Sequence, residues 1–157
     1  MVIDMRRIDV GVDEANELLS QAGLASVNTM EILQGGWDNT NILLTLTDAS
    51  KVVLKVWNAN TIEEVRRVVA RHCHLDEHGI PTAVPIEFLD GELVVEQEGM
   101  AWTLLPFVEG GMLGTDEKSL KSLGETLARL HQIPTTDCFP TDYRMGWSLF
   151  EEMFEIA

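Results

Sequence analysis

The chain has 157 residues, of which 45% are hydrophobic and 24% charged, the balance of one folded domain rather than of a disordered chain. Eleven basic residues against 26 acidic ones give a formal net charge of −15, which repels nucleic-acid backbones and anionic membrane surfaces and argues against both as partners. No segment approaches the roughly 18 apolar residues of a membrane span, and Cys73 and Cys138 form no CxxC pair, so we expect a cytoplasmic protein with free thiols.

The first half of the chain predicts a helix followed by a three-stranded antiparallel meander. Residues 12–22 place apolar side chains at helical spacing, and Gly23 follows as a helix terminator. The spacing then changes to the alternation that is typical of strands. The expected strands are residues 27–33, 40–47 and 52–57. A Gly35-Gly36 turn separates the first two, and a polar turn separates the second from the third.

The second half predicts a long helix, two or three strands, a glycine linker and a second long helix. The first of these helices ends at Gly79, which Pro81 follows. Helices are expected at residues 61–78, at 116–131 and, near the end of the chain, at 149–156. Strands are expected at residues 86–89, 92–97 and 101–107. The helix at 116–131 carries a leucine stripe with acids in its first turn, and its apolar face is expected to be exposed.

Lys55 is the only charged residue of the apolar segment 52–57. A lysine among branched side chains is costly unless it is paired or functional, although the alternation of a strand could also place it on a solvent face. Two strands joined by a glycine turn, a lysine on the third strand and then a helix form the arrangement by which kinases hold a nucleotide. The sequence therefore indicates a phosphate-binding lysine at Lys55.

Four segments resemble the amino-terminal lobe of the aminoglycoside phosphotransferase and choline kinase superfamily, and within it the homoserine kinase type II branch. They are GGWDNTNILLTL, VVLKVW, HGIPTAVPI, and LLPFVEGG followed by LGETLARLHQIP. The resemblance implies an α+β fold, a protein-kinase-like N-terminal lobe with an antiparallel sheet of about five strands and a packed helix, followed by the hinge and the first helices of a C-terminal lobe. It implies a nucleotide-binding lobe at 1–107, a hinge at 108–114 and the start of a truncated C-terminal lobe at 115–157.

The resemblance also assigns residues to the phosphates of a bound ATP. Gly35, Gly36 and Asn39 match the family's phosphate-covering turn. Lys55 matches the lysine that contacts the α- and β-phosphates. The resemblance implies ATP and Mg²⁺ as cofactors. The Mg²⁺ ligands are expected in the C-terminal lobe, and none is assigned among the residues of this chain.

For the adenine ring, the resemblance points to the last strand and the segment after it. Leu105 would lie at the back of the adenine pocket, and Phe107 and Val108 would offer backbone groups to the adenine edge. Ile32 and Leu54 could line the faces of the ring. Burial in an ordinary strand core would explain Leu105, Ile32 and Leu54 equally well.

Two interpretations of Glu64 remain open. The acid that pairs with the family's lysine would fall on Val68 in this chain, and Glu64, one helical turn earlier, could take its place. However, Thr61 and Glu64 also have the spacing of a capping box, in which Glu64 bonds the start of the helix. The cap is the favoured interpretation. His74 and His78 share a helix face, but without a second ligand cluster they favour a surface helix over a metal site.

The family's transfer chemistry uses an HGD-x-x-x-x-N segment, which these 157 residues do not contain. No catalytic residue is therefore assigned, and we expect the chain alone to hydrolyse no ATP. The expected function is the ATP-binding part of a phosphotransferase that moves the γ-phosphoryl group to a hydroxyl of a homoserine-, aminoglycoside- or choline-like small molecule. The alternative is a non-catalytic module that binds a nucleotide or another protein. Self-association through the exposed leucine helix is a further expectation.

Overall fold

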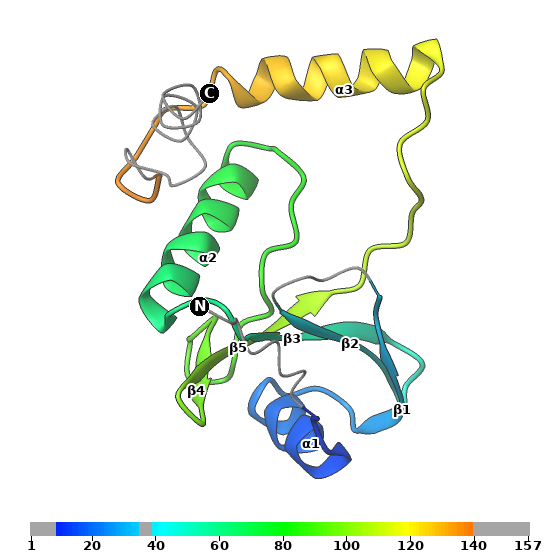
Figure 1. Cartoon of the computed structure of the whole chain (residues 1–157), viewed down its shortest axis with the longest axis vertical. Coiled ribbons are helices and arrows are strands. Elements are labelled where there is room, and N and C mark those ends of the chain that lie inside the picture. The colour runs from blue at the N-terminus through cyan, green and yellow to red at the C-terminus, as the bar shows by residue number, and fades with distance from the viewer. Residues whose placement is uncertain (1–8, 35–38, 140–157) are drawn as a thin grey trace, which may run out of the picture.

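The structure is a computed structural model that describes residues 9–34 and 39–139 (Figure 1). Its elements are α1 (Val12–Gln21), β1 (Val27–Ile32), β2 (Thr40–Leu46), β3 (Lys51–Trp57), α2 (Ile62–Glu77), β4 (Val95–Gln97), β5 (Met100–Pro106) and α3 (Glu117–Leu130). The five strands form one antiparallel sheet in the order β1-β2-β3-β5-β4. The expected α+β fold with a five-stranded antiparallel sheet and packed helices is confirmed.

Helix α1 packs on one face of the sheet (Figure 1). Its apolar residues Ala15, Leu18 and Leu19 are fully buried against alternate residues of β2, β3 and β5. Gly23 ends the helix with a positive φ of 67°, while the N–H groups of Gly23 and Leu24 bond the carbonyls of Ser20 and Leu19. This pair of hydrogen bonds is the Schellman motif, which satisfies the last carbonyls of a helix. The core that supports the strands therefore lies on the α1 face.

Helix α2 lies on the opposite face of the sheet (Figure 1). Val65 and Val69 of α2 are buried against Trp57 of β3 and Ala101 of β5. The helix ends at Gly79, whose φ is 72°, with a second pair of Schellman bonds from Gly79 and the residue after it. Because α2 covers only one end of this face, the middle of β2, β3 and β5 stays partly accessible.

Two expected strand assignments are wrong. Residues 86–89 form no strand, because the chain there is tied to two different elements. The N–H of Ile86 donates to Leu104 O of β5 at 2.7 Å, whereas the N–H of Leu89 donates to Gln21 O at the end of α1 at 2.8 Å. The expected strand at 92–97 shrinks to β4, because Leu93 and Val94 turn into the apolar cluster under α2.

Helix α3 is joined to β5 by an extended segment and meets α2 near the carboxyl ends of both helices (Figure 1). The guanidinium of Arg129 donates to Gly79 O at 3.0 Å, and His74 Nε2 bonds Pro134 O at 2.8 Å. No residue of α3 is buried, and Leu123 and Leu127 are 41% and 43% exposed. His131 is also exposed. The helix expected at 149–156 lies outside the described residues. None of the helices described is long and apolar enough to cross a membrane.

Candidate functional site

The registers of three strands gather six side chains on the face that α2 leaves partly open. Paired residues in an antiparallel sheet project to the same side, and alternate residues along a strand do as well. Asn41 of β2 and Thr103 of β5 flank Lys55 of β3, and one step along the sheet Leu43 and Leu105 flank Val53 in the same way. We call these residues the site face: Asn41, Leu43, Val53, Lys55, Thr103 and Leu105. A cation thus lies beside a small apolar platform.

Lys55 is half-buried, and within residues 9–34 and 39–139 no carboxylate forms an ion pair with it. Burial lowers the pKa of its ammonium group from the ordinary 10.5. The ion pairs formed among the described residues do not include Lys55. Its Nζ instead lies 3.8 Å from the centroid of the Trp57 ring, well within cation–π range. The site face therefore presents a desolvated positive charge that an anionic group could neutralise.

The capping interpretation of Glu64 is confirmed. Thr61 Oγ1 accepts the N–H of Glu64 at 3.2 Å, and Glu64 Oε2 accepts the N–H of Thr61 at 2.8 Å. This reciprocal pair holds the first turn of α2. Glu64 and Lys55 form no ion pair with each other. Glu64 therefore does not take the role of the helix acid that pairs with this lysine in kinases.

His72 is the α2 residue whose charge couples to Lys55. Burial lowers the pKa of its imidazole, and the positive charges of Lys55 and Arg71 lower it further. Its Nδ1 lies 2.5 Å from Thr82 Oγ1, in a hydrogen bond that fixes the ring. In the sequence, the one sign of this role is that His72 lies one helical turn after Val68, which packs against the apolar cluster under α2.

The start of β2 carries the described part of the expected phosphate turn. Gly35 and Gly36 lie outside the described residues. Asn39 is half-buried, and its Oδ1 is buried without a hydrogen-bond partner among the residues described. The next residue, Thr40, is fixed by a bond from its N–H to Asn58 Oδ1 at 3.2 Å. Asn39 therefore offers an unsatisfied amide oxygen where the turn enters the strand.

The expected adenine-edge residues follow directly from the site face. Leu105 is half-buried beside Val53. The β3–β5 ladder ends at Pro106, and Phe107 and Val108 follow it directly. Phe107 continues the alternation of Leu105, and the Nζ of Lys51 lies 5.3 Å from the centroid of its ring. The two residues expected at the adenine edge therefore lie where the chain leaves β5.

Leu54 and Ile32 do not line this face, which corrects their expected role. Leu54 is fully buried in the core under α1, because it neighbours Lys55 in sequence and adjacent strand residues point to opposite faces. Ile32 pairs with Ile42 of that same core. The apolar residues that share the face of Lys55 are Leu43, Val53 and Leu105. The sequence could have identified two of them. Val53 lies two residues before Lys55, and Leu43 is the residue that pairs with Val53 across the β2–β3 turn.

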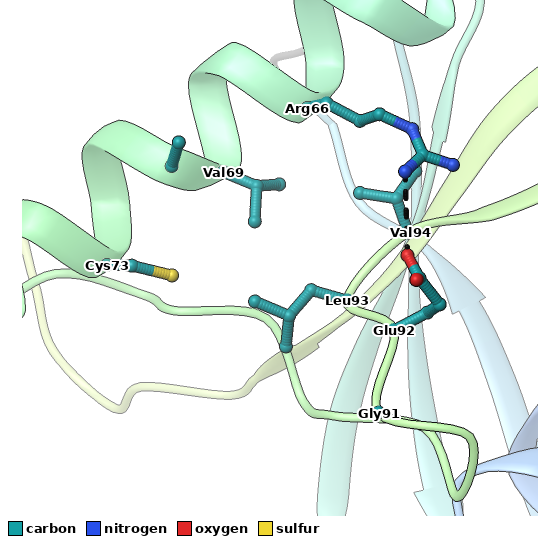
Figure 2. Close-up of a pocket in the computed structure, with 8 residues that line it drawn as sticks. Arg66, Val69, Cys73, Gly91, Glu92, Leu93 and Val94 are labelled. Carbon is teal, nitrogen blue, oxygen red and sulfur yellow. Dashed lines mark ion pairs between the residues drawn. The ribbon is translucent and has the colours of Figure 1, made fainter. Parts of the chain in front are cut away.

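Figure 2 shows a separate hollow of about 250 Å³ between α2 and the segment that precedes β4. Val69 and Cys73 from α2 and Leu93 from the facing segment point into it, and an ion pair of 3.5 Å between Arg66 and Glu92 closes one side. None of its lining residues belongs to the site face. Burial, with Glu77 and Asp76 nearby, raises the pKa of the Cys73 thiol. The described residues contain no cluster of three or more potential metal ligands.

The chain belongs to the phosphotransferase enzyme family (APH), which it matches over residues 29–155. It is 29% identical over 124 residues to a homoserine kinase of Bradyrhizobium diazoefficiens, a match that covers 78% of this chain and 38% of that protein. A homoserine kinase of Methylobacillus flagellatus is 30% identical over 119 residues, with 75% and 34% covered. The resemblance to the superfamily and its homoserine kinase-like branch is confirmed, while the chain spans less than half the length of these relatives.

Solved structures agree on the fold. Spectinomycin phosphotransferase, in complex with ADP and spectinomycin, superposes with a TM-score of 0.66 at 20% identity over 82% of this chain and 40% of that one. An aminoglycoside phosphotransferase from Alicyclobacillus acidocaldarius gives a TM-score of 0.68 at 14% identity over 99% and 44%. At these identities the likeness extends to the fold alone.

Proposed function

We propose that the chain is the ATP-binding part of a phosphotransferase, in which the site face receives the nucleotide. The observation that carries this proposal is Lys55, a half-buried cation that forms no ion pair with any carboxylate of the described residues and lies on the partly open face of a kinase-like sheet. A phosphate oxygen close to Lys55 would restore the interactions that the ammonium loses on burial. Gly35, Gly36 and Asn39 would cover the same phosphates from the β1–β2 turn.

The base would rest on the apolar part of the site face. Leu43, Val53 and Leu105 supply an apolar surface beside Lys55, and such a surface suits the flat face of an adenine ring. Phe107 and Val108 would bond the edge of the adenine through their backbone groups. Spectinomycin phosphotransferase, which shares the fold, was solved in complex with ADP, and this supports nucleotide binding by the present chain. The chain would then consist of a nucleotide lobe at 1–107, a hinge at 108–114 and the start of a second lobe at 115–157.

In the proposed reaction, the hydroxyl oxygen of a small molecule attacks the γ-phosphorus of ATP and loses its proton to a base, the bond to the β,γ-bridging oxygen breaks, and ADP leaves. The acceptor would be a homoserine-, aminoglycoside- or choline-like alcohol. Mg²⁺ would accompany ATP, and we assign it no ligand among the described residues. The residues that orient the acceptor hydroxyl would lie outside these 157.

Titration of the chain with ATP in a calorimeter tests the proposal. Lys55→Met should weaken binding by about tenfold or more, because a hydrogen bond to a charged group contributes about 1.5–3 kcal/mol. Lys121→Met is the matched control, since Lys121 is an exposed residue of α3 that pairs with Glu125 and does not belong to the site face. Equal affinities for the wild-type chain and Lys55→Met would contradict the proposal.

One feature favours the second candidate, a protein-interaction module. Helix α3 exposes Leu120, Leu123 and Leu127 along one face, and a stripe of this kind on a capped helix is typical of a contact surface. We propose that α3 mediates self-association of the chain. This surface lies on a different element from the site face, so both activities can coexist.

A further inference from the structure

Kinases place the lysine that binds the phosphates opposite a carboxylate of the neighbouring helix, and the position of that helix then controls the lysine. Here the helix offers no such carboxylate. Glu64 caps the first turn of α2, and His72, whose charge couples to Lys55, is not an acid. Something else must hold the long side chain of Lys55 over the site face.

Trp57 occupies the place where that support is needed. It lies two residues after Lys55 on the same strand, so both side chains project to the same face. The Nζ of Lys55 is 3.8 Å from the centroid of the indole. Trp57 as a residue is 8% exposed, and cation–π contacts gain strength when they are desolvated in this way.

The indole is itself held in place on two sides. Its Nε1 donates to Thr103 Oγ1 at 3.1 Å, and Thr103, which is fully buried, is also the direct cross-strand partner of Lys55. On the other side the ring packs against Val65 and Val69 of α2. The ring therefore has one orientation, set by β5 and α2 together.

We propose that Trp57 is the positioning residue for Lys55, with its ring holding the ammonium group in place of a helix carboxylate and Thr103 holding the ring. This inference rests on the proposed nucleotide function. It deepens that function, because an aromatic ring attracts the ammonium without neutralising its charge. Lys55 thus keeps its full charge for the phosphates, and α2 acts on the lysine only through its packing on the indole.

The contact can be measured directly by NMR, without a nucleotide. The chain has three other lysines, and Lys55→Arg assigns the Lys55 signal among the four. The other three are Lys51, Lys118 and Lys121. Protons that lie over the face of an aromatic ring are shielded, so the ε-methylene protons of Lys55 should resonate upfield of the other three sets. Trp57→Leu should abolish this upfield shift, and Trp57→Phe should retain part of it.

Trp102→Phe is the matched control. Trp102 is a fully buried tryptophan of the same sheet, it faces the core under α1, and its Nε1 has no hydrogen-bond partner among the described residues. Trp102→Phe removes a buried indole on the opposite face of the sheet from Lys55. The upfield shift of the Lys55 ε-methylene protons should therefore remain in this variant. Thr103→Val is a milder second variant, which leaves the ring but removes its acceptor, and it should reduce the Lys55 shift even if Trp57→Leu folds poorly.

ATP titrations of the same variants connect the contact to function. Trp57→Leu should weaken binding by about two- to tenfold, the range expected for a cation–π contact, while Trp102→Phe should leave the affinity unchanged. A Lys55 signal that stays upfield in Trp57→Leu overturns the positioning role alone. A wild-type chain that shows the upfield shift but binds no ATP overturns the proposed nucleotide function and, with it, the purpose assigned to the contact.

Discussion

At the scale of single residues, the site combines two basic groups that the fold has partly removed from water. Burial lowers the pKa of Lys55 in β3, and burial together with the charge of Lys55 lowers the pKa of His72 in α2. Charge on His72 would therefore also add to the positive potential of the phosphate site. Because its pKa is lowered, His72 should make the free energy of unfolding depend on pH.

We predict that His72 makes the fold less stable as the medium becomes acidic. The pKa of His72 is below 6.5 in the folded chain and ordinary in the unfolded chain, so in the window between these values the unfolded chain binds more protons. The free energy of unfolding therefore falls as the pH drops from above 6.5 through the folded-state pKa. Urea denaturation at pH 7 and pH 5 should show a smaller difference for His72→Gln than for the wild type. Equal differences would contradict the assigned burial.

The parity of β3 shows how far the sequence could predict this site. Lys55 stood out as the only charge of the apolar segment 52–57, and Leu105 follows from the same alternation once β5 is paired with β3. Leu54 was expected to line the adenine ring, but it is adjacent to Lys55, and adjacent residues of a strand point to opposite faces of the sheet. Trp57 carried a usable signal, an aromatic residue at i+2 from a buried lysine. Thr103 could not be identified as its partner, because that contact depends on the β3–β5 register.

At the scale of elements, the ends of helices are the best-predicted features. Gly23 and Gly79 mark where α1 and α2 stop, and both adopt the positive φ that glycine tolerates. The meander of β1, β2 and β3 is equally readable, since short turns join its strands. The insertion of β5 between β3 and β4 is not, because it depends on pairing between distant segments. The expected strand at 86–89 does not form for a related reason. The N–H of Leu89 donates to Gln21 O at the end of α1 and not to a neighbouring strand.

The two helix-terminal glycines should differ in their sensitivity to alanine. A side chain at Gly79 would meet nothing within 4 Å, so Gly79→Ala should cost only the left-handed strain of about 1–2 kcal/mol. At Gly23 a new Cβ would also approach Leu89 Cδ2 at 3.3 Å, so Gly23→Ala should cost more. Denaturant unfolding of both variants gives the comparison. A larger loss for Gly79→Ala would contradict the geometry.

The capping box of α2 is a further element with a measurable contribution. Thr61→Ala removes the hydroxyl that accepts the N–H of Glu64, and we expect a loss of about 1 kcal/mol in the free energy of unfolding. Thr126→Ala is the control in the interior of α3, where the hydroxyl only bonds back to Ser122 O. Because alanine favours a helix interior, that variant should be neutral or slightly stabilising.

At the scale of the whole molecule, a net charge of −15 opposes contact between copies, and α3 departs from that trend. Its residues 117–130 hold two acids and three bases around the leucine stripe. Association through α3 would therefore bury apolar surface without bringing like charges together. Raising the salt concentration should strengthen association, because it screens the repulsion between the remaining surfaces.

Sedimentation velocity over a range of concentrations tests this surface. The wild-type chain should shift toward larger species as its concentration rises, and Leu123→Gln combined with Leu127→Gln should sediment as a smaller species under the same conditions. Leu89→Gln is the control, because Leu89 is 78% exposed but lies far along the chain from α3. A wild-type chain that remains monomeric at high concentration would rule out self-association.

The order of strands in the sheet also bears on how the site comes into being as the chain folds. β1, β2 and β3 succeed one another, so their pairing closes only short loops, whereas β5 reaches β3 only after residues 58–99 have been looped out. Loop closure makes such distant pairing slow. We therefore expect Lys55 to be in a formed hairpin before Thr103 and Leu105 arrive. A nucleotide that needs all three strands would recognise only the finished sheet, and so would act mainly by slowing its unfolding.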